Sequence, residues 1–225
     1  MLEVPGVRWS ARASPPPLGD DGLHVWLIPC GETGAGSLPP LSLLSRMERG
    51  RAERLRQEHH KTRYIRAHAG LRRVLARYLN QEPQRIRYDY GSAGKPSLPS
   101  GPEFNLTTSG DLALVAVCRD RPVGIDCEPL KPHTGLDAIA RRMFPAAESA
   151  ALAAAPQTEK LQRFCLSWTA LEAAVKADGR GLGRSRVEPP MPKLDVAHFT
   201  PEPGFIAAVA RADLPPLRAW STLML

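Results

Sequence analysis

The chain has 225 residues, of which 43% are hydrophobic and 24% charged, a composition typical of a globular protein with one large domain or two small ones. No apolar run approaches the roughly 20 residues that cross a bilayer, and the N-terminus lacks the layout of a secretory signal, so we expect a cytoplasmic protein that contacts no membrane. The net charge of +7 is compatible with a nucleic acid, a polyphosphate ligand or an acidic partner protein, and does not choose among them.

The first part of the chain predicts one strand followed by a long helical region. Residues 10–22 include three consecutive prolines and indicate an irregular arm, and residues 24–29 form a short strand closed by proline. From about 41 to 79 the pattern is helical, and apolar side chains recur at three- and four-residue steps, which predicts one buried face. We expect most arginines of its first part to lie at the surface. These are Arg49, Arg51, Arg54 and Arg56.

The middle of the chain is rich in strands. Residues 103–107 precede a turn at 109–111, and residues 112–118 are continuously apolar, as expected for a strand that is covered on both faces. A tight connection through Pro122 leads to another strand over residues 123–128.

The last part predicts helices and then strands. Helices are expected over roughly 135–155 and 157–178, and the glycines from 179 end the second one. Short strands follow near residues 194–199, 205–211 and 217–223. Because strands and helices succeed each other twice, we expect an α+β fold of two similar halves, residues 1–121 and 122–225, with the acidic motifs in the second.

The four cysteines predict neither a disulfide framework nor a zinc site. They lie far apart, with no C-x-x-C pair and no nearby histidine pair. We therefore expect Cys30, Cys118, Cys127 and Cys165 to be free buried thiols in a reducing compartment.

The strand over 123–128 carries two acids on one face. Side chains alternate along a strand, so Val123, Ile125 and Cys127 point into a core while Gly124, Asp126 and Glu128 point the other way. Neighbouring carboxylates repel each other and need a compensating cation or hydrogen-bond donors. A magnesium ion fits such oxygen ligands and keeps places for substrate phosphate. The alternative is an edge strand with a solvated acidic face.

A third acid lies on the helix over 157–178. Glu172 and Lys176 are four residues apart at the border of an apolar stripe that includes Trp168 and Val175. In this order such a pair stabilises an exposed helix by a few tenths of a kcal/mol. The functional interpretation is a third metal-binding carboxylate beside an ammonium group that receives phosphate charge.

Candidate phosphate contacts lie in two turns and on one helix. Lys95 follows a glycine and precedes a proline, which would hold its direction, although the segment does not match a P-loop. Thr107, Thr108 and Ser109 offer hydroxyl groups at a strand end, and Arg63 on the helix could reach the same ligand. Each of these segments is also compatible with a plain turn or a surface position.

Taken together, these motifs resemble the Sfp-type 4′-phosphopantetheinyl transferases, in both order and spacing. The resemblance is carried by Gly94-Lys95-Pro96, Phe104-Asn105-Leu106-Thr107-Thr108-Ser109, Val123-Gly124-Ile125-Asp126-Cys127-Glu128, Trp168-Thr169-Ala170-Leu171-Glu172-Ala173-Ala174-Val175-Lys176 and the glycines of 179–183. It covers residues 94–183.

The resemblance implies a fold, an activity and partners. The fold is an α+β protein with two halves related by a pseudo-twofold axis, which acts as a monomer and binds coenzyme A between the halves. The activity is that of a holo-[acyl-carrier-protein] synthase: transfer of the phosphopantetheine arm of coenzyme A, with Mg²⁺, to a serine of an apo acyl or peptidyl carrier protein, releasing 3′,5′-ADP. The carrier would belong to fatty-acid, polyketide or nonribosomal-peptide synthesis.

The resemblance also assigns roles to individual residues. Asp126, Glu128 and Glu172 would bind the metal, with Glu172 also acting as or positioning the base. Lys176 would contact the transferring phosphate. Lys95, Thr107 and Thr108 would lie along the nucleotide end of coenzyme A, and Arg63 would bind its 3′-phosphate.

Two positions depart from the family pattern. Thr108 stands where the family usually has a phosphate-binding histidine, and Leu171 stands where a lysine usually precedes the helix glutamate. Neither departure alters the three acids. The alternatives are another magnesium-dependent phosphotransferase or phosphodiesterase, or a family member that binds coenzyme A without catalysis. A nucleic-acid-binding module is disfavoured, because no aromatic stacking pattern or nucleic-acid motif accompanies the arginines.

Overall fold

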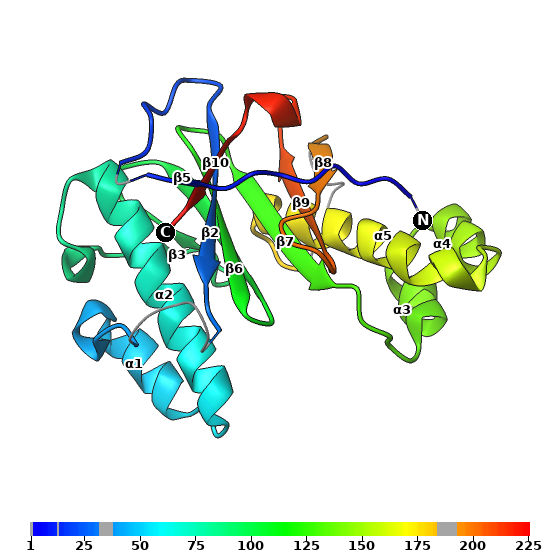
Figure 1. Ribbon diagram of the computed structural model, residues 1–225, viewed down its shortest axis with the longest axis horizontal. Helices are drawn as coiled ribbons and strands as arrows, with labels where there is room; N and C mark the ends of the chain where they lie inside the picture. The colour runs from blue at the N-terminus through cyan, green and yellow to red at the C-terminus, as the bar shows by residue number, and fades with distance from the viewer. Residues whose placement is uncertain (1, 13, 32–37, 184–192) are drawn as a thin grey trace.

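The structure is a computed structural model that describes residues 2–12, 14–31, 38–183 and 193–225 (Figure 1). Its strands are β1 (Ser10–Ala11), β2 (Leu23–Pro29), β3 (Asp89–Tyr90), β4 (Pro96–Ser97), β5 (Glu103–Ser109), β6 (Leu112–Cys118), β7 (Val123–Pro129), β8 (Asp195–Phe199), β9 (Phe205–Arg211) and β10 (Ser221–Met224). Its α-helices are α1 (Arg46–Glu53), α2 (Glu58–Leu79), α3 (Leu136–Met143), α4 (Ala146–Ala153) and α5 (Gln157–Asp178). Short 3₁₀ helices cover Leu41–Leu43, Pro83–Arg85 and Leu217–Ala219.

Two sheets form the middle of the molecule. The first has the strand order β1-β10-β2-β6-β5 and the second has the order β7-β9-β8, while β3 and β4 make a separate hairpin. The sheets meet where β7 lies beside β5, and the Ile125 N–H donates to the Asn105 side chain at 2.9 Å across this junction. The junction places the ends of β5 and β7 next to each other.

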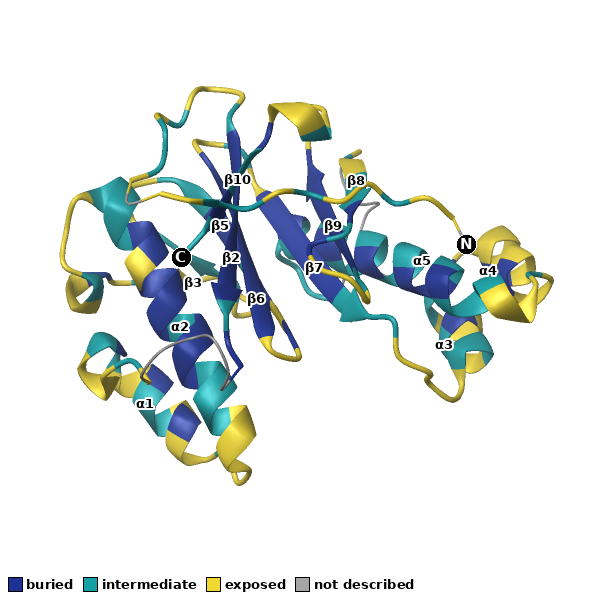
Figure 2. Ribbon diagram, viewed as in Figure 1, coloured by how far each residue is buried: buried dark blue, intermediate teal, exposed yellow. Residues whose placement is uncertain are grey.

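Alternation along the strands divides the core into layers. On β2 and β6 one set of side chains, such as Val25 and Leu114, packs against the second sheet. The other set, such as Trp26 and Val115, packs against α2. Small alanines of β9 pack against Ala173 and Ala177 of α5. The layers therefore run from α2 through the two sheets to α5, and Figure 2 shows the central strands buried throughout.

The α+β fold class and most elements are confirmed. The strand over 112–118 and the helix over 157–178 have the predicted bounds. The helical region from 41 to 79 is interrupted, since α1 ends at Glu53 and α2 begins at Glu58. All four cysteines are free and buried, as predicted.

The chain ends differ from the prediction. The expected strand over 217–223 is a 3₁₀ turn followed by β10, and the arm expected to be irregular contains β1. Both strands run parallel inside the first sheet, where β10 lies between β1 and β2. The end of the expected second half thus completes the sheet of the first. The division at residue 121 stays a prediction.

Both long helices belong to the globular layers. No helix in the described ranges is long and apolar enough to cross a membrane.

Candidate active site

The site is built where α5 crosses the acidic face of β7. Val123, Ile125 and Cys127 pack in the core between the sheets, as the alternation predicted. Gly124 lies on the opposite face of β7, where α5 packs against it. A Cβ at Gly124 would lie 1.9 Å from the Ala173 carbonyl oxygen. The missing side chain lets helix and strand approach, which brings acids from both elements to one place.

Asp126 is the most buried of these acids, with 4% of its surface exposed. Its Oδ1 accepts hydrogen bonds from Lys176 Nζ at 2.6 Å and Thr107 Oγ1 at 3.1 Å. Its Oδ2 is buried and has no hydrogen-bond partner among the described residues. A buried carboxylate oxygen without a partner is costly. This face of β7 is therefore not the solvated acidic face of the alternative interpretation.

Glu128 and Glu172 are half-buried beside Asp126. Burial raises the pKa of both carboxyl groups, and the negative charge of Asp126 raises it further. Trp168 Nε1 donates to Glu128 Oε1 at 3.2 Å, which orients that side chain. All three acids line one pocket of about 360 Å³, which we call the acid pocket. Its lining also includes His68, Leu106, Thr107, Thr108, Trp168 and Lys176.

The acid pocket has the donor chemistry of a magnesium site without being a formed one. Three carboxylates and an unpartnered oxygen suit a hard divalent cation. Within the described ranges, however, no three acid, histidine or cysteine side chains are arranged closely enough to hold a metal ion. In the structure the cation beside Asp126 is the Lys176 ammonium group, which also donates to the Ile125 carbonyl oxygen. Metal binding stays a prediction.

The predicted nucleotide contacts are only partly brought to this site. Thr107 and Thr108 line the acid pocket. Lys95 lines a neighbouring pocket with Glu172 and Lys176, but its ammonium donates to the carbonyl oxygens of Val123 and Ala177. Burial lowers the pKa of this ammonium group.

Arg63 lies elsewhere. Its guanidinium pairs with Asp111 at 2.7 Å, and it does not line the acid pocket. The structure therefore does not place Arg63 beside the three acids, and its role at the 3′-phosphate stays a prediction.

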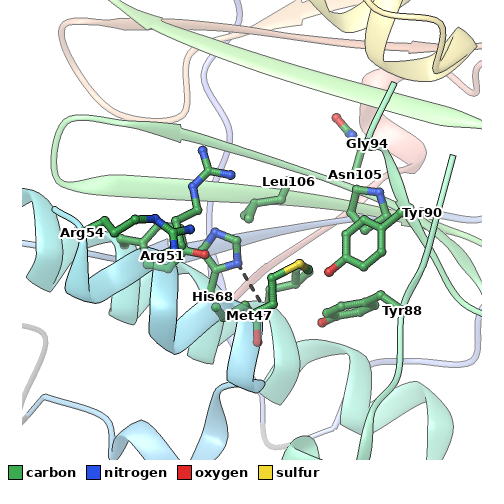
Figure 3. A pocket seen from close by; sticks show the side chains of 13 residues that line it. Met47, Arg51, Arg54, His68, Tyr88, Tyr90, Gly94, Asn105 and Leu106 are labelled. Carbon is green, nitrogen blue, oxygen red and sulfur yellow. Dashed lines mark ion pairs between the residues drawn. The ribbon is translucent and has the colours of Figure 1, made fainter. Parts of the chain in front are cut away.

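A second pocket of about 340 Å³ adjoins the acid pocket and contains arginines of α1 (Figure 3). We call it the arginine pocket. Its lining includes Arg51, Arg54, Tyr64, His68, Tyr88, Tyr90, Gly94, Pro96, Asn105 and Leu106. His68 and Leu106 line both pockets, so the two are adjacent.

Sequence reasoning missed the arginine pocket as a site. Arg51 and Arg54 are exposed, as expected, but they face a cavity and not open solvent alone. Arg51 and Arg54 are three residues apart and therefore lie on one helical face, which is the sequence signal that could have indicated a shared site.

An apolar groove of about 270 Å³ lies on the other side of Glu128. It is formed by the segment after β7, α3 and α5, and it contains Leu136, Ile139, Leu161, Phe164 and Trp168. Lys131 and His133 are at its rim. We call it the α3–α5 groove. Since Glu128 and Trp168 line both the groove and the acid pocket, a partner in the groove would lie next to the acids.

Comparison with known proteins gives a consistent result. The family model of the 4′-phosphopantetheinyl transferase superfamily matches residues 122–222. The chain is 34% identical to the 4′-phosphopantetheinyl transferase HetI of Nostoc sp. over 91% of this chain and 83% of that protein. It is 32% identical to the putative 4′-phosphopantetheinyl transferase slr0495 of Synechocystis sp. over 71% and 65%, and 33% identical to the 4′-phosphopantetheinyl transferase Sfp of Bacillus subtilis over 58% and 59%.

Proposed function

Since this chain belongs to the 4′-phosphopantetheinyl transferase superfamily, we propose that its acid pocket transfers the phosphopantetheine arm of coenzyme A to a carrier-protein serine. The observation that carries the assignment of the site is the grouping of Asp126, Glu128 and Glu172 with Lys176 in one pocket that adjoins the arginine pocket. A ligand that consists of a diphosphate linked to a nucleotide would occupy both pockets.

Asp126, Glu128 and Glu172 are the residues that would hold Mg²⁺. The unpartnered Oδ2 of Asp126 and the raised pKa of the two glutamates, caused by burial and by the charge of Asp126, support a missing positive charge here. When bound, the ion would neutralise the diphosphate and stabilise the departing phosphate.

The residues of the chain would align the reaction and move its proton. The serine oxygen forms a bond to the β-phosphorus of coenzyme A, while the bond from that phosphorus to the bridging oxygen breaks and 3′,5′-ADP departs. Glu172 is the proposed base that accepts the hydroxyl proton, because a free serine is a poor nucleophile at neutral pH. Lys176, held by Asp126 and Thr107, is placed to compensate charge on the transferring phosphate.

The arginine pocket is the proposed site of the nucleotide end. Arg51 and Arg54 supply positive charge for phosphate, and Tyr64 and Tyr88 supply aromatic surface. Thr107 and Thr108 line the acid pocket, where the diphosphate would lie. Arg63 and Lys95 keep their proposed contacts only if their present partners, Asp111 and two carbonyl oxygens, are exchanged for ligand.

The α3–α5 groove is the proposed docking place of the carrier. Its apolar floor and its rim of Lys131 and His133 suit an acidic helical domain that presents apolar side chains. The net charge of +7 would steer such a partner, so we expect transfer to weaken as salt rises. We further propose that the enzyme acts as a cytoplasmic monomer on acyl or peptidyl carriers, as a holo-[acyl-carrier-protein] synthase does.

The direct test combines the protein with Mg²⁺, coenzyme A and a panel of apo carrier domains. Intact-mass measurement of each carrier should show addition of the arm, and the panel ranks the partners. Asp126→Ala should abolish transfer with an unchanged circular dichroism spectrum, while Asp120→Ala, an exposed aspartate before β7, should not affect it. Full activity of Asp126→Ala would remove Asp126 from the mechanism.

A binding experiment separates the alternatives. Coenzyme A should raise the unfolding temperature more than simple nucleotides do; equal shifts would favour another phosphotransferase or phosphodiesterase. Coenzyme A binding with no transfer to any carrier would favour a non-catalytic family member. Calorimetric titration of Mg²⁺, with coenzyme A present, should show binding that Asp126→Ala abolishes.

A further inference from the structure

His68 lies at the meeting point of the two pockets. It is one helical turn after Tyr64 on α2, and its side chain lines both the arginine pocket and the acid pocket. The sequence motifs single out Arg63 on α2 as a candidate ligand contact, but they do not point to His68. A ligand that extends from one pocket into the other must pass this ring.

The ring is held by a buried carboxylate. His68 Nδ1 is 3.5 Å from Glu48 Oε1, and the other oxygen of Glu48 accepts from Arg72 Nε at 2.8 Å and from the Ser45 backbone N–H at 2.6 Å. Although burial opposes it, the hydrogen bonds from His68 and Ser45 and the charge of Arg72 lower the pKa of Glu48 to about 2. An ionised carboxylate only accepts, so Nδ1 is the donor in this contact.

The opposite edge of the ring is available to a ligand. Tyr64 packs on the ring with centroids 4.1 Å apart, which limits its rotation. In Figure 3 one nitrogen of His68 is directed to the ion pair with Glu48 and the other is directed away from it. With Nδ1 engaged, a proton on Nε2 makes the ring a cationic donor, and phosphate oxygens are its natural acceptors.

We propose that His68 is a substrate-contacting residue that donates from Nε2 to the diphosphate of coenzyme A, with Glu48 as its positioning residue. The inference rests on the proposed function. His68 shares the acid pocket with Thr108, the position where the family resemblance expects a phosphate-binding histidine. The imidazole absent from β5 is thus supplied from α2.

The test moves the imidazole between the two positions. His68→Ala should raise both the Kd and the KM for coenzyme A about 10- to 100-fold, the range expected for the loss of one charge-assisted hydrogen bond. Adding Thr108→His to this variant should recover most of the lost affinity. His59→Ala is the matched control, since His59 is exposed on the same helix and outside both pockets.

The binding measurements distinguish a direct contact of His68 with the ligand from an effect on folding, and they do not depend on transfer activity. Calorimetry with coenzyme A and with 3′,5′-ADP measures binding without transfer, so loss of affinity in a chain that never transfers would defeat the function and keep this inference. Affinity of His68→Ala within twofold of the parent would overturn it. Weakened binding that Thr108→His does not restore would show that His68 acts only on packing. If the alanine variant unfolds, His68→Gln replaces it: this side chain keeps a neutral donor and should bind coenzyme A more weakly than the parent, and affinity within twofold of the parent would again overturn the proposal.

Discussion

The carboxylate of Glu48 and the three carboxylates of the acid pocket have different surroundings. Glu48, between α1 and α2, is 4% exposed and is met by Arg72, His68 and its own helix cap. The acids of the acid pocket meet one ammonium group, Lys176, and one oxygen of Asp126 has no partner among the described residues. Partners lower the pKa of Glu48 against its burial, whereas burial and the charge of Asp126 raise the pKa of Glu128 and Glu172.

Glu48 stabilises the fold and positions His68, whereas the acids of the acid pocket would meet metal and substrate directly. Removing one partner of a buried ion pair is strongly destabilising, because the other charge is left without compensation. A group of like charges with too few partners costs stability and is typical of a site that completes itself with a ligand. Removal of a carboxylate charge should therefore lower stability at Glu48, and should lower transfer without a loss of stability in the acid pocket.

The sharpest contrast is expected from Glu128→Gln. Removal of one charge from the acid pocket should lower transfer at least about 100-fold, the scale of losing one preorganised electrostatic contact. Stability should hold, because the amide oxygen can still accept from Trp168 and one repulsion is removed. Intact-mass kinetics and denaturant unfolding measure the two effects, with exposed Glu202→Gln as control. Unchanged transfer would place the chemistry elsewhere.

Glu48→Gln should destabilise the fold and, through His68, weaken coenzyme A binding. Arg72, 1% exposed, would lose its carboxylate partner, and the free energy of unfolding should fall by about 3 kcal/mol. Urea unfolding measures it, with the exposed Glu53→Gln on the same helix as reference. A loss below about 1 kcal/mol would mean that the carbonyl oxygens of Pro83 and Ile86 suffice for Arg72.

The pH dependence of stability at acid pH should contain separate contributions from the buried His24 and from Glu48. Burial lowers the pKa of His24 from 6.5 to about 4, and Tyr78, which accepts from Trp26, donates its hydroxyl proton to the neutral His24 ring. The unfolded chain binds the proton first, so this contribution is complete above pH 6.5 and is lost as pH falls through 4. The contribution of Glu48 is complete above pH 4.5 and is lost toward about 2.

The pH ranges in which the contributions of His24 and Glu48 are lost can be separated with His24→Asn. The amide oxygen of this variant can replace Nδ1 as the acceptor. The variant should lack a loss of about 3 kcal/mol between pH 6.5 and 4 that the parent shows, and should keep the loss below pH 4.5. Urea midpoints measured across this range give both slopes. Parallel profiles for parent and variant would contradict a neutral buried His24.

A severe steric effect is expected from Gly124→Ala. The added methyl group would lie 1.9 Å from the Ala173 carbonyl oxygen and 2.5 Å from the Ala177 backbone nitrogen, which would force β7 and α5 apart. The loss of stability should reach about 3 kcal/mol or more, the upper end for an overpacked core. Transfer should fall as well, because Asp126 and Glu172 lie on the two separated elements. Gly183→Ala, where a Cβ meets nothing within 4 Å, is the control.

Local patterns in the sequence were sufficient for much of the fold and part of the site. Alternation along 123–128 placed Asp126 and Glu128 on one face, and helical spacing placed Glu172 and Lys176 together at the border of a buried stripe. The continuous apolar run of β6 correctly indicated a strand covered on both faces. Such features depend on neighbours in the chain, whose geometry the strand and helix periods define.

What only the tertiary structure decided involves partners distant in sequence. Periodicity could not show that Glu48 meets Arg72 and His68, that Lys95 turns to the end of α5, or that β10 enters the first sheet. It also could not show that Arg51 and Arg54 face a cavity that adjoins the acid pocket. Each of these depends on how layers pack after the chain closes long loops, and side-chain directions at such contacts are set by the assembled neighbours.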